Sequence, residues 1–307
     1  MRSSKPKVLH EAGGISLLAH VIRTARTLEP ASVTVVVGHM ADRVGAVAEG
    51  MGCRSVLQAE QHGTAHALLQ TRDLLKGATG TVLLLSGDVP LLQRDTLEAL
   101  LQQHAATGAA ATVLTAIVDR PTGYGRIVRF GGQIAAIVEE RDASPDQRAI
   151  QEINAGVYAF DLNCLWGGLE RIAATNSQGE YYLTDLIRVL GEDGRTLSTC
   201  RVEDSHSVMG VNNQMELAQA GKNLRDRKNA TLMAAGVTLL DPSTTYIDED
   251  VTVGPDTVIH PGVQIQGTSN VGHGCTIHSQ VRLVNAQLAD GVTINNFTVV
   301  MDARVSE

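Results

Sequence analysis

The sequence predicts an α/β protein built from two parts: a layered domain of alternating helices and strands, and a short parallel β-helix. Two observations support this prediction. Between residues 15 and 57, helical and strand-like segments alternate, which is typical of parallel strands joined by right-handed crossovers. From Ile247 onward, aliphatic residues recur at every sixth position, a period that neither a helix nor a flat strand produces.

Length, charge and cysteine content limit the classes of protein to which the chain can belong. With 307 residues, 43% of them hydrophobic, it can bury a sizeable core and is long enough for two domains. A formal net charge of -8 without a long basic run argues against a nucleic-acid partner. There is no apolar run of 18 residues and no signal-peptide pattern, so neither a membrane span nor export is expected. The cysteines are widely spaced, which argues against a zinc site or disulfide framework and favours the reducing cytoplasm; they are Cys53, Cys164, Cys200 and Cys275.

Residues 1–75 begin with a basic segment and continue as alternating elements. Lys7 lies ahead of the first helix, where a lysine can bind phosphate or simply remain solvated. Helices are predicted at residues 15–28 and 42–51, and strands at 33–37 and 55–57. Gln58 then offers a donor and an acceptor to a base edge, Gly63 allows a ligand close to the backbone, and Thr64 is expected to cap a helix through residue 75.

The segment of residues 82–90 suggests the chemistry. Residues 82–85 are an unalternating apolar run, as expected of a strand buried on both faces of a parallel sheet. Asp88 follows that strand, at the sheet edge where open α/β proteins bind ligands, and Pro90 prevents the strand from continuing. Asp88 can therefore hold a divalent metal with a phosphorylated ligand, or it can be an ordinary turn residue; this segment alone does not decide.

The remaining elements before residue 240 complete the first part of the chain. Helices are predicted at residues 94–106, 165–174, 183–190 and 214–235, and strands at 111–118, 134–138, 150–160 and 198–202. Residues 121–127 have the composition of a hairpin turn. Asn154 lies within a strand-forming run although asparagine is disfavoured there, which suggests a ligand contact.

The last part of the chain is a repeat whose register can be counted. The six-residue series comprises Ile247, Val253, Ile259, Ile265, Val271, Ile277 and Leu283, and it resumes after a five-residue step with Leu288, Ile294 and Val300. Positions four residues further on are small or β-branched: Val251, Thr257, Val263, Ser269, Cys275 and Val281. Three hexapeptides form one coil of such a solenoid, so about three coils are expected.

Taken together, these segments resemble the GlmU family, the bifunctional N-acetylglucosamine-1-phosphate uridylyltransferases and glucosamine-1-phosphate acetyltransferases. The matching stretches run in family order over almost the whole chain; they are residues 5–10, 58–64, 87–90, 123–127, 137–139, 152–154, 179–185 and 210–213. The resemblance implies a Rossmann-like nucleotidyltransferase domain at 1–212, a linker helix at 213–240 and part of a left-handed β-helix at 241–307. Hexapeptide solenoids of this kind commonly trimerise, so a homotrimer is expected.

The resemblance also implies a reaction and a set of site residues. Uridine triphosphate (UTP) and N-acetylglucosamine 1-phosphate would give UDP-N-acetylglucosamine and pyrophosphate, for cell-wall and lipopolysaccharide precursors. Asp88 and Asn212 match the ligands of Mg²⁺, and Lys7 matches a phosphate-binding lysine that acts in catalysis with Asp88. Gln58, Gly63 and Thr64 match the uracil-reading positions. The positions that match the sugar contacts are Gly125, Glu139, Asn154 and Thr184.

The resemblance further predicts truncation at both ends of the chain. Met1 corresponds to the last methionine of the family's nucleotide-binding loop, so the first strand and the glycine-rich loop are expected to be missing. The β-helix stops before the acetyl-transfer residues, so acetyltransferase activity is not expected. Two alternatives remain open: a nucleotidyltransferase for another sugar phosphate, and a catalytically impaired module that trimerises.

Overall fold

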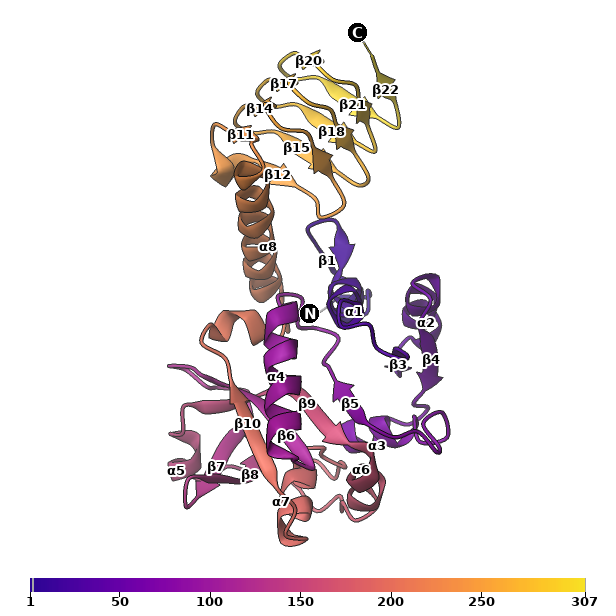
Figure 1. The fold of residues 1–307 in the computed structure, drawn as a ribbon, viewed down its shortest axis with the longest axis vertical. Helices are drawn as coiled ribbons and strands as arrows, with labels where there is room; N and C mark the ends of the chain where they lie inside the picture. The colour runs from indigo at the N-terminus through magenta and orange to yellow at the C-terminus, as the bar shows by residue number, and fades with distance from the viewer. Residues whose placement is uncertain (2, 307) are drawn as a thin grey trace. The chain divides into compact units, whose positions relative to one another are not determined.

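The structure is a computed structural model that describes residues 1 and 3–306. Contacts divide the chain into two compact units (Figure 1). One unit comprises Leu18–Gly210; the other comprises Met1–Leu17 together with Val211–Glu307. The first seventeen residues therefore pack with the C-terminal part of the chain.

The unit Leu18–Gly210 is organised around a mixed sheet. Its strand order is β10-β6-β9-β7-β8, and β5 also pairs with β9. The strands are β5 (Thr81–Leu84), β6 (Ala111–Ile117), β7 (Arg126–Phe130), β8 (Gln133–Val138), β9 (Glu152–Asp161) and β10 (Leu197–Arg201). Only β10 and β6 run parallel; every other pair in this sheet is antiparallel. The helices of this part are α4 (Arg94–Thr107), α5 (Pro145–Arg148), α6 (Leu162–Leu169), α7 (Asp185–Glu192) and the short 3₁₀ helix η2 (Ser205–Val208).

The prediction for residues 82–85 was right about a strand and wrong about its surroundings. β5 pairs antiparallel with β9, and its residues are half-buried or exposed. An apolar run indicates that a segment is at least partly buried, but it does not indicate whether the neighbouring strand is parallel or antiparallel. The predicted parallel neighbours of residues 82–85 were wrong for this reason. The segment 121–127 is not a hairpin turn either, because it joins β6 to β7 and both strands pair with β9.

Along one of its two edges, the long strand β9 pairs with two different strands in succession. Along one edge it pairs with β6 through most of its length. Along the other edge its first part meets β7, through Ile153 and Arg126, and its last part meets β5, from Tyr158 to Asp161. Residues 154–157 therefore lie where β5 and β7 diverge. We call this place the fork of β9.

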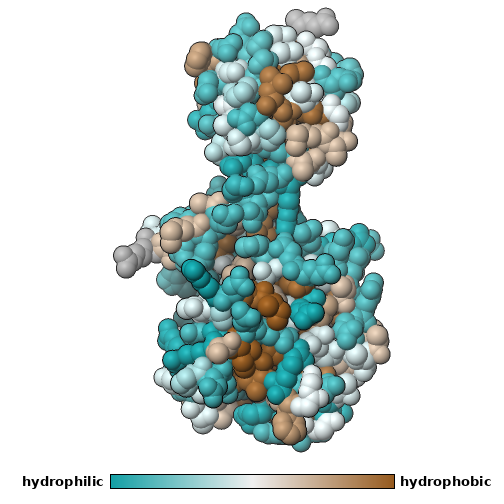
Figure 2. Space-filling view, turned by 90° about the vertical axis from the view of Figure 1, so that its left-hand side faces the viewer, coloured by the Kyte–Doolittle hydropathy of each residue, from teal (hydrophilic) through white to brown (hydrophobic). Residues whose placement is uncertain are grey.

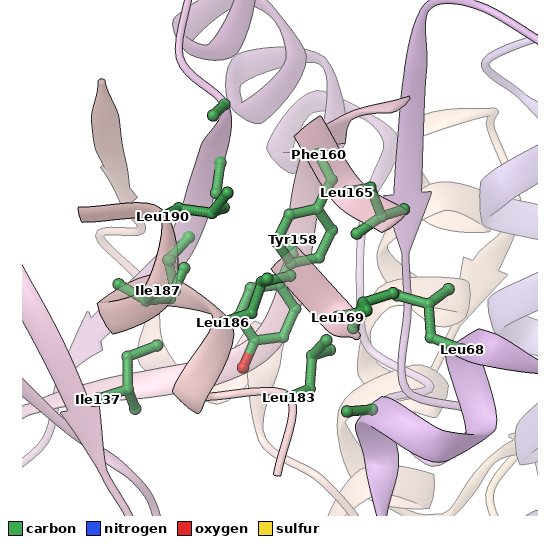
Figure 3. Packing of buried hydrophobic residues seen from close by; sticks show 14 of the residues in the cluster. Leu68, Ile137, Tyr158, Phe160, Leu165, Leu169, Leu183, Leu186, Ile187 and Leu190 are labelled. Carbon is green, nitrogen blue, oxygen red and sulfur yellow. The ribbon is translucent and has the colours of Figure 1, made fainter. Parts of the chain in front are cut away.

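A hydrophobic core between the sheet and α6 and α7 supports this edge. In Figure 3, side chains of β9, α6 and α7 converge, including Tyr158, Phe160, Leu165 and Leu186. The Tyr158 and Phe160 rings stack with their centroids 5.4 Å apart. Close packing of this kind restricts the side chains that face it, so the fork is attached to a rigid support.

Residues 18–69 form a second, smaller layer of the same unit. Strands β3 (Thr34–Val37) and β4 (Arg54–Leu57) pair in parallel, and the helices are α1 (Leu17–Arg26), α2 (Ala41–Gly50) and α3 (Thr64–Leu69). The parallel pair confirms the crossover rhythm predicted from the sequence. Helix α3 ends at Leu69, well short of residue 75, because residues 70–77 continue as turns.

The C-terminal part of the other unit is a parallel β-helix. Three four-stranded parallel sheets run through it: β11-β14-β17-β20, β12-β15-β18-β21 and β13-β16-β19-β22. Paired residues are 20 apart between β11 and β14, 18 apart in the next pairs, as in Tyr246 with Gln264, and 17 apart later, as in Arg282 with Val299. The change from 18 to 17 follows the five-residue step that interrupts the repeat. The strands, in chain order, are Thr238–Leu239, Tyr246–Ile247, Thr252–Val253, Val258–Ile259, Gln264–Gln266, Asn270–Val271, Thr276–Ile277, Arg282–Val284, Gln287–Leu288, Thr293–Ile294, Val299–Met301 and Arg304–Val305.

The predicted repeat positions are the core of this solenoid. Ile259, Ile265, Ile277 and Leu283 are fully buried, and so are the small residues four positions on, such as Cys275. Two strands lie outside the predicted series: β11 precedes Ile247 and β22 follows Val300, so each sheet has four strands where about three coils were expected.

Helix α8 (Gln214–Ala234) and a short hairpin complete this unit. The helix confirms the prediction for residues 214–235, and Asn213 caps it by accepting the Glu216 amide N–H at 2.9 Å. The hairpin consists of β1 (Glu11–Ala12) and β2 (Ile15–Ser16), preceded by the 3₁₀ turn η1 (Lys7–Leu9); a second such turn, η3 (Pro242–Thr244), precedes β12.

Figure 2 shows a mostly hydrophilic surface on which hydrophobic residues gather in local patches. Across residues 1 and 3–306, no helix combines the length and apolar character needed to cross a bilayer.

Candidate active site

The four predicted sugar-contacting residues meet at the fork of β9. The Asn154 N–H donates to the Gly125 carbonyl at 2.8 Å, and the Thr184 hydroxyl donates to Glu139 Oε1 at 3.3 Å. Gly125 lies beside that carboxylate, since a Cβ at this position would be 3.4 Å from Glu139 Oε1 and 3.0 Å from Ile137 Cγ2. A side chain larger than hydrogen would therefore crowd Ile137 and fill the space beside Glu139, which explains why glycine suits this position.

Asn154 is held in a fixed orientation by its own strand. Its Nδ2 donates to the Tyr158 hydroxyl at 2.6 Å, and its Oδ1 accepts the Gly156 N–H at 3.0 Å. Gly156 has φ +71°, a left-handed conformation that glycine adopts readily and that turns its N–H back toward the side chain. An asparagine amide has a second N–H and a second lone pair, so Asn154 can still bind a ligand after both bonds are made.

The carboxyl group of Glu139 has an unusual electrostatic environment. Burial raises the pKa of Glu139, the hydrogen bond from Thr184 opposes that rise, and the charges of Asp142 and Asp185 add to it. The charge of Arg126 acts in the opposite direction. Arg126 is almost completely buried and forms an ion pair with Glu140 at 2.5 Å. A carboxyl group held this way suits recognition of neutral hydroxyl or amide hydrogens.

Sequence reasoning missed two residues that support this group. Tyr158 is buried beneath Asn154, and burial raises the pKa of its hydroxyl above the usual tyrosine value, so it remains a neutral hydrogen-bonding group. Arg126 was recognised only as part of a matching stretch, although it is the largest fully buried side chain among the described residues. The composition of a strand does not reveal which polar residues it turns inward, so no signal in the sequence identifies either role.

The predicted uracil-reading residues form a second cluster. Gln58 is buried at the end of β4, and its Nε2 donates to the Gly63 carbonyl at 3.0 Å and lies 3.1 Å from His66 Nδ1. Thr64 does not cap α3 as predicted: Gly63 is the N-cap residue, and the Thr64 hydroxyl accepts the Leu183 N–H at 3.0 Å. This bond places the cluster next to the chain segment that carries Thr184.

Gly63 is the point at which this loop contacts the chain at Tyr181. Its φ of +106° and the closeness of the Tyr181 carbonyl, 2.5 Å from where a Cβ would lie, leave no room for a side chain. Hydrogen bonds on both sides of Gly63 fix this contact, from Tyr181 N–H to the His62 carbonyl at 2.7 Å and from Ala65 N–H to the Tyr181 carbonyl at 3.0 Å.

Asp88 lies in the loop after β5, which is anchored by buried neighbours. Val89, Leu91 and Leu92 are each at most 4% exposed. The Ser86 hydroxyl donates to the Gly156 carbonyl at 3.2 Å, which connects this loop to the fork of β9. The Asp88 carboxylate faces the backbone at Gly210, where a Cβ would be 3.5 Å from Oδ2.

Lys7 and Asn212 form a pair within the other unit. Lys7 Nζ donates to Asn212 Oδ1 at 3.1 Å. The Asn212 backbone N–H donates to Glu216 Oε2 at 2.6 Å, so the first turn of α8 fixes its position. Among the described residues, no three His, Cys, Asp or Glu side chains form a metal-binding group. A metal at Asp88 or Asn212 would instead have oxygen ligands from a carboxylate and an amide, a donor type that suits a hard divalent cation.

Comparison with known proteins defines the class to which this fold and site belong. The family of MobA-like NTP transferase domains matches residues 1–154. Together with the relatives described below, this match makes the chain a sugar-phosphate nucleotidyltransferase by class.

Relatives identify the particular family. The chain is 45% identical over 312 residues to the bifunctional protein GlmU of Trichlorobacter lovleyi, covering all of this chain and 67% of that protein. It is 46% identical over 301 residues to GlmU of Streptomyces avermitilis (96% of this chain, 62% of the relative) and 45% identical over 303 residues to GlmU of Mycobacterium bovis (96% and 61%). The chain therefore belongs to the GlmU family, and it spans about two-thirds of the length of these relatives.

Proposed function

We propose that the protein transfers UMP from UTP to N-acetylglucosamine 1-phosphate, giving UDP-N-acetylglucosamine and pyrophosphate. A phosphate oxygen of the sugar phosphate attacks the α-phosphorus of UTP in line, and the bond to the leaving pyrophosphate breaks. Such a reaction needs little covalent participation by the protein, and catalysis depends on positioning and on neutralising charge.

One observation carries the sugar half of this proposal: Gly125, Glu139, Asn154 and Thr184 meet at the fork of β9. Glu139 offers carboxylate oxygens to hydroxyl hydrogens, and Asn154 offers an amide that can recognise both a donor and an acceptor. Thr184 and Tyr158 hold these two groups in place by hydrogen bonds. A neutral sugar with an amide substituent matches this set of donors and acceptors better than a charged one.

The nucleotide half rests on the two remaining groups of residues. Gln58, Gly63 and Thr64 form a hydrogen-bonded loop, which we propose reads the uracil. Lys7 would bind the triphosphate through its ammonium group. Asp88 and Asn212 would hold Mg²⁺, and this ion would supply positive charge against the phosphate oxygens. Their placement along the chain supports this assignment, because Asn212 follows by two residues the Gly210 backbone that the Asp88 carboxylate faces.

We further propose that the protein is a homotrimer assembled through the β-helix and that it works in the cytoplasm. Three apolar side chains are exposed near the last coils: Phe297 at 78%, Val299 at 59% and Met301 at 55%. Exposed hydrophobic residues that gather in this way are typical of a protein interface. All four cysteines are free thiols, as expected in a reducing compartment.

The proposed reaction is tested by pyrophosphate release from the whole chain with Mg²⁺, measured over a panel of nucleotides and sugar 1-phosphates. We expect UTP with N-acetylglucosamine 1-phosphate to be the preferred pair. A different preferred sugar would favour the first alternative, and no release with any pair would favour the non-catalytic trimerising module.

A substitution at Asp88 tests the metal assignment. Asp88→Asn should lower kcat by at least about a hundredfold, because a carboxylate charge is lost from the metal site. Asp73→Asn makes the same change at an exposed position and should leave kcat unchanged. Near-normal turnover of Asp88→Asn at every Mg²⁺ concentration would rule out Asp88 as a metal ligand.

A further inference from the structure

The β1–β2 hairpin is attached to the first coil of the β-helix through its turn. The Glu249 N–H donates to the Gly13 carbonyl at 2.9 Å. The same segment is held from α8, since Lys228 Nζ donates to the carbonyls of Glu249 and Val251, each at 2.8 Å. The hairpin turn thus contacts a part of the β-helix that is itself fixed.

The turn can approach this closely only because it consists of two glycines. Gly13 has φ +60° and Gly14 has φ +82°, conformations that residues with a Cβ adopt only at a cost. A Cβ on Gly14 would lie 2.8 Å from Asp248 Cβ and 2.5 Å from its Oδ2. Asp248 has little freedom to move away, because its Oδ2 accepts the Gly267 N–H at 2.9 Å.

Beside the turn, the hairpin is not supported by continuous packing. A cavity of about 550 Å³ opens between β1, α8 and β12, with Ala12, Leu217 and Tyr246 in its lining. The turn is therefore a principal point at which the β-helix determines the position of the hairpin.

A chain of hydrogen bonds connects the hairpin to Lys7. The His10 N–H donates to the Lys7 carbonyl at 3.2 Å, and the Leu17 N–H, just after β2, donates to the His10 carbonyl at 2.9 Å. Lys5 also pairs with Glu11 of β1 at 2.7 Å. A displacement of the hairpin would thus move the backbone of Lys7, while Asn212 remains fixed by the first turn of α8.

We propose that the Gly13–Gly14 turn, through its contacts with Asp248 and Glu249, is a positioning element that holds Lys7 beside Asn212 for binding of the triphosphate. We call these contacts of the turn the clasp. Through this turn the β-helix contributes to nucleotidyl transfer without touching the substrate. The inference rests on the proposed function, because it assigns Lys7 to the triphosphate of that reaction.

The test substitutes Gly14→Ala in the whole chain, with Gly77→Ala as the matched control. Gly77 has φ +77°, and a Cβ there would meet no atom within 4 Å, so the control reproduces the backbone strain without the clash. We expect Gly14→Ala to lower kcat/KM for UTP by about ten- to a hundredfold, the range that follows from a displacement near 1 Å. Gly77→Ala should change it less than about twofold, and adding Asp248→Gly to Gly14→Ala should restore part of the loss.

Two further measurements separate positioning from general damage. In a Lys7→Ala background, Gly14→Ala should lower kcat/KM by less than about threefold, because the residue through which it acts is gone. Amide hydrogen exchange of residues 7–17 should accelerate in Gly14→Ala and not in Gly77→Ala. Equal losses of kcat/KM with and without Lys7 would overturn the positioning role, and unchanged exchange would overturn the clasp. If the parent protein released no pyrophosphate, the proposed function would fail, while the exchange experiment would still test the clasp.

Discussion

Gly63→Ala should be among the most damaging single-methyl substitutions in the chain. Gly63 has φ +106° and ψ 178°, a backbone region used almost only by glycine, which costs other residues about 1–3 kcal/mol. The new Cβ would also lie 2.5 Å from the Tyr181 carbonyl oxygen and 2.9 Å from its nitrogen. Relief of that overlap would break at least one of the flanking backbone hydrogen bonds, which costs roughly another 1–3 kcal/mol for a buried group.

We therefore expect Gly63→Ala to reduce the free energy of unfolding by about 2–6 kcal/mol, measured by urea denaturation. Gly77→Ala, at φ +77° and with no atom within 4 Å of the new Cβ, should lose only about 1–2 kcal/mol. Because Gln58 donates to the Gly63 carbonyl, the KM for UTP should rise more than the KM for the sugar phosphate. Equal free energies of unfolding for Gly63→Ala and Gly77→Ala would refute this prediction, because the overlap with Tyr181 would then not destabilise the protein.

Two other predictions concern charge and assembly. The raised pKa of Glu139 means that the folded protein binds this proton more tightly than the unfolded chain does; the contribution of Glu139 to stability is therefore greatest below the unfolded pKa and is lost as the pH rises through the folded pKa. Glu139→Gln should flatten this part of the curve of unfolding free energy against pH, whereas the exposed control Glu203→Gln should not; identical curves for all three proteins would contradict the assigned burial effect. Phe297 has φ +62°, a conformation that asparagine tolerates well, so Phe297→Asn should preserve the melting temperature while shifting the mass measured by light scattering from trimer toward monomer. An unchanged mass would remove Phe297 from the proposed interface.

The β-helix was the part of the fold most fully predictable from the sequence. Its coils stack directly, so residues that face the core recur at a fixed interval, and Ile259, Ile265 and Ile277 could be assigned to the core by counting. The five-residue step in the series even anticipated the change in pairing distance from 18 to 17 residues. Two strands were missed, because β11 (Thr238–Leu239) lies ahead of the periodic series and β22 (Arg304–Val305) lies beyond its last position, Val300.

The mixed sheet was less predictable, because strand direction and partner are set by distant segments. The run at residues 82–85 indicated burial, yet β5 pairs antiparallel with β9, more than seventy residues further on. Thr64 does not cap α3 for a similar reason, since its hydroxyl instead accepts the N–H of Leu183, more than a hundred residues further on.

For the candidate site, the sequence by itself determined the identities: an asparagine where a strand disfavours it, and an ordered set of stretches that match one family. Only the tertiary structure decided which of these residues meet. Asn154 meets the Gly125 carbonyl where the edge of β9 divides between two strands, and Thr184 reaches Glu139 from the N-cap of α7, more than forty residues away. Hydrogen bonds and burial act over a few ångströms in space, whereas sequence patterns report only on the local chain, so the supporting residues of the site became visible only once the chain was folded.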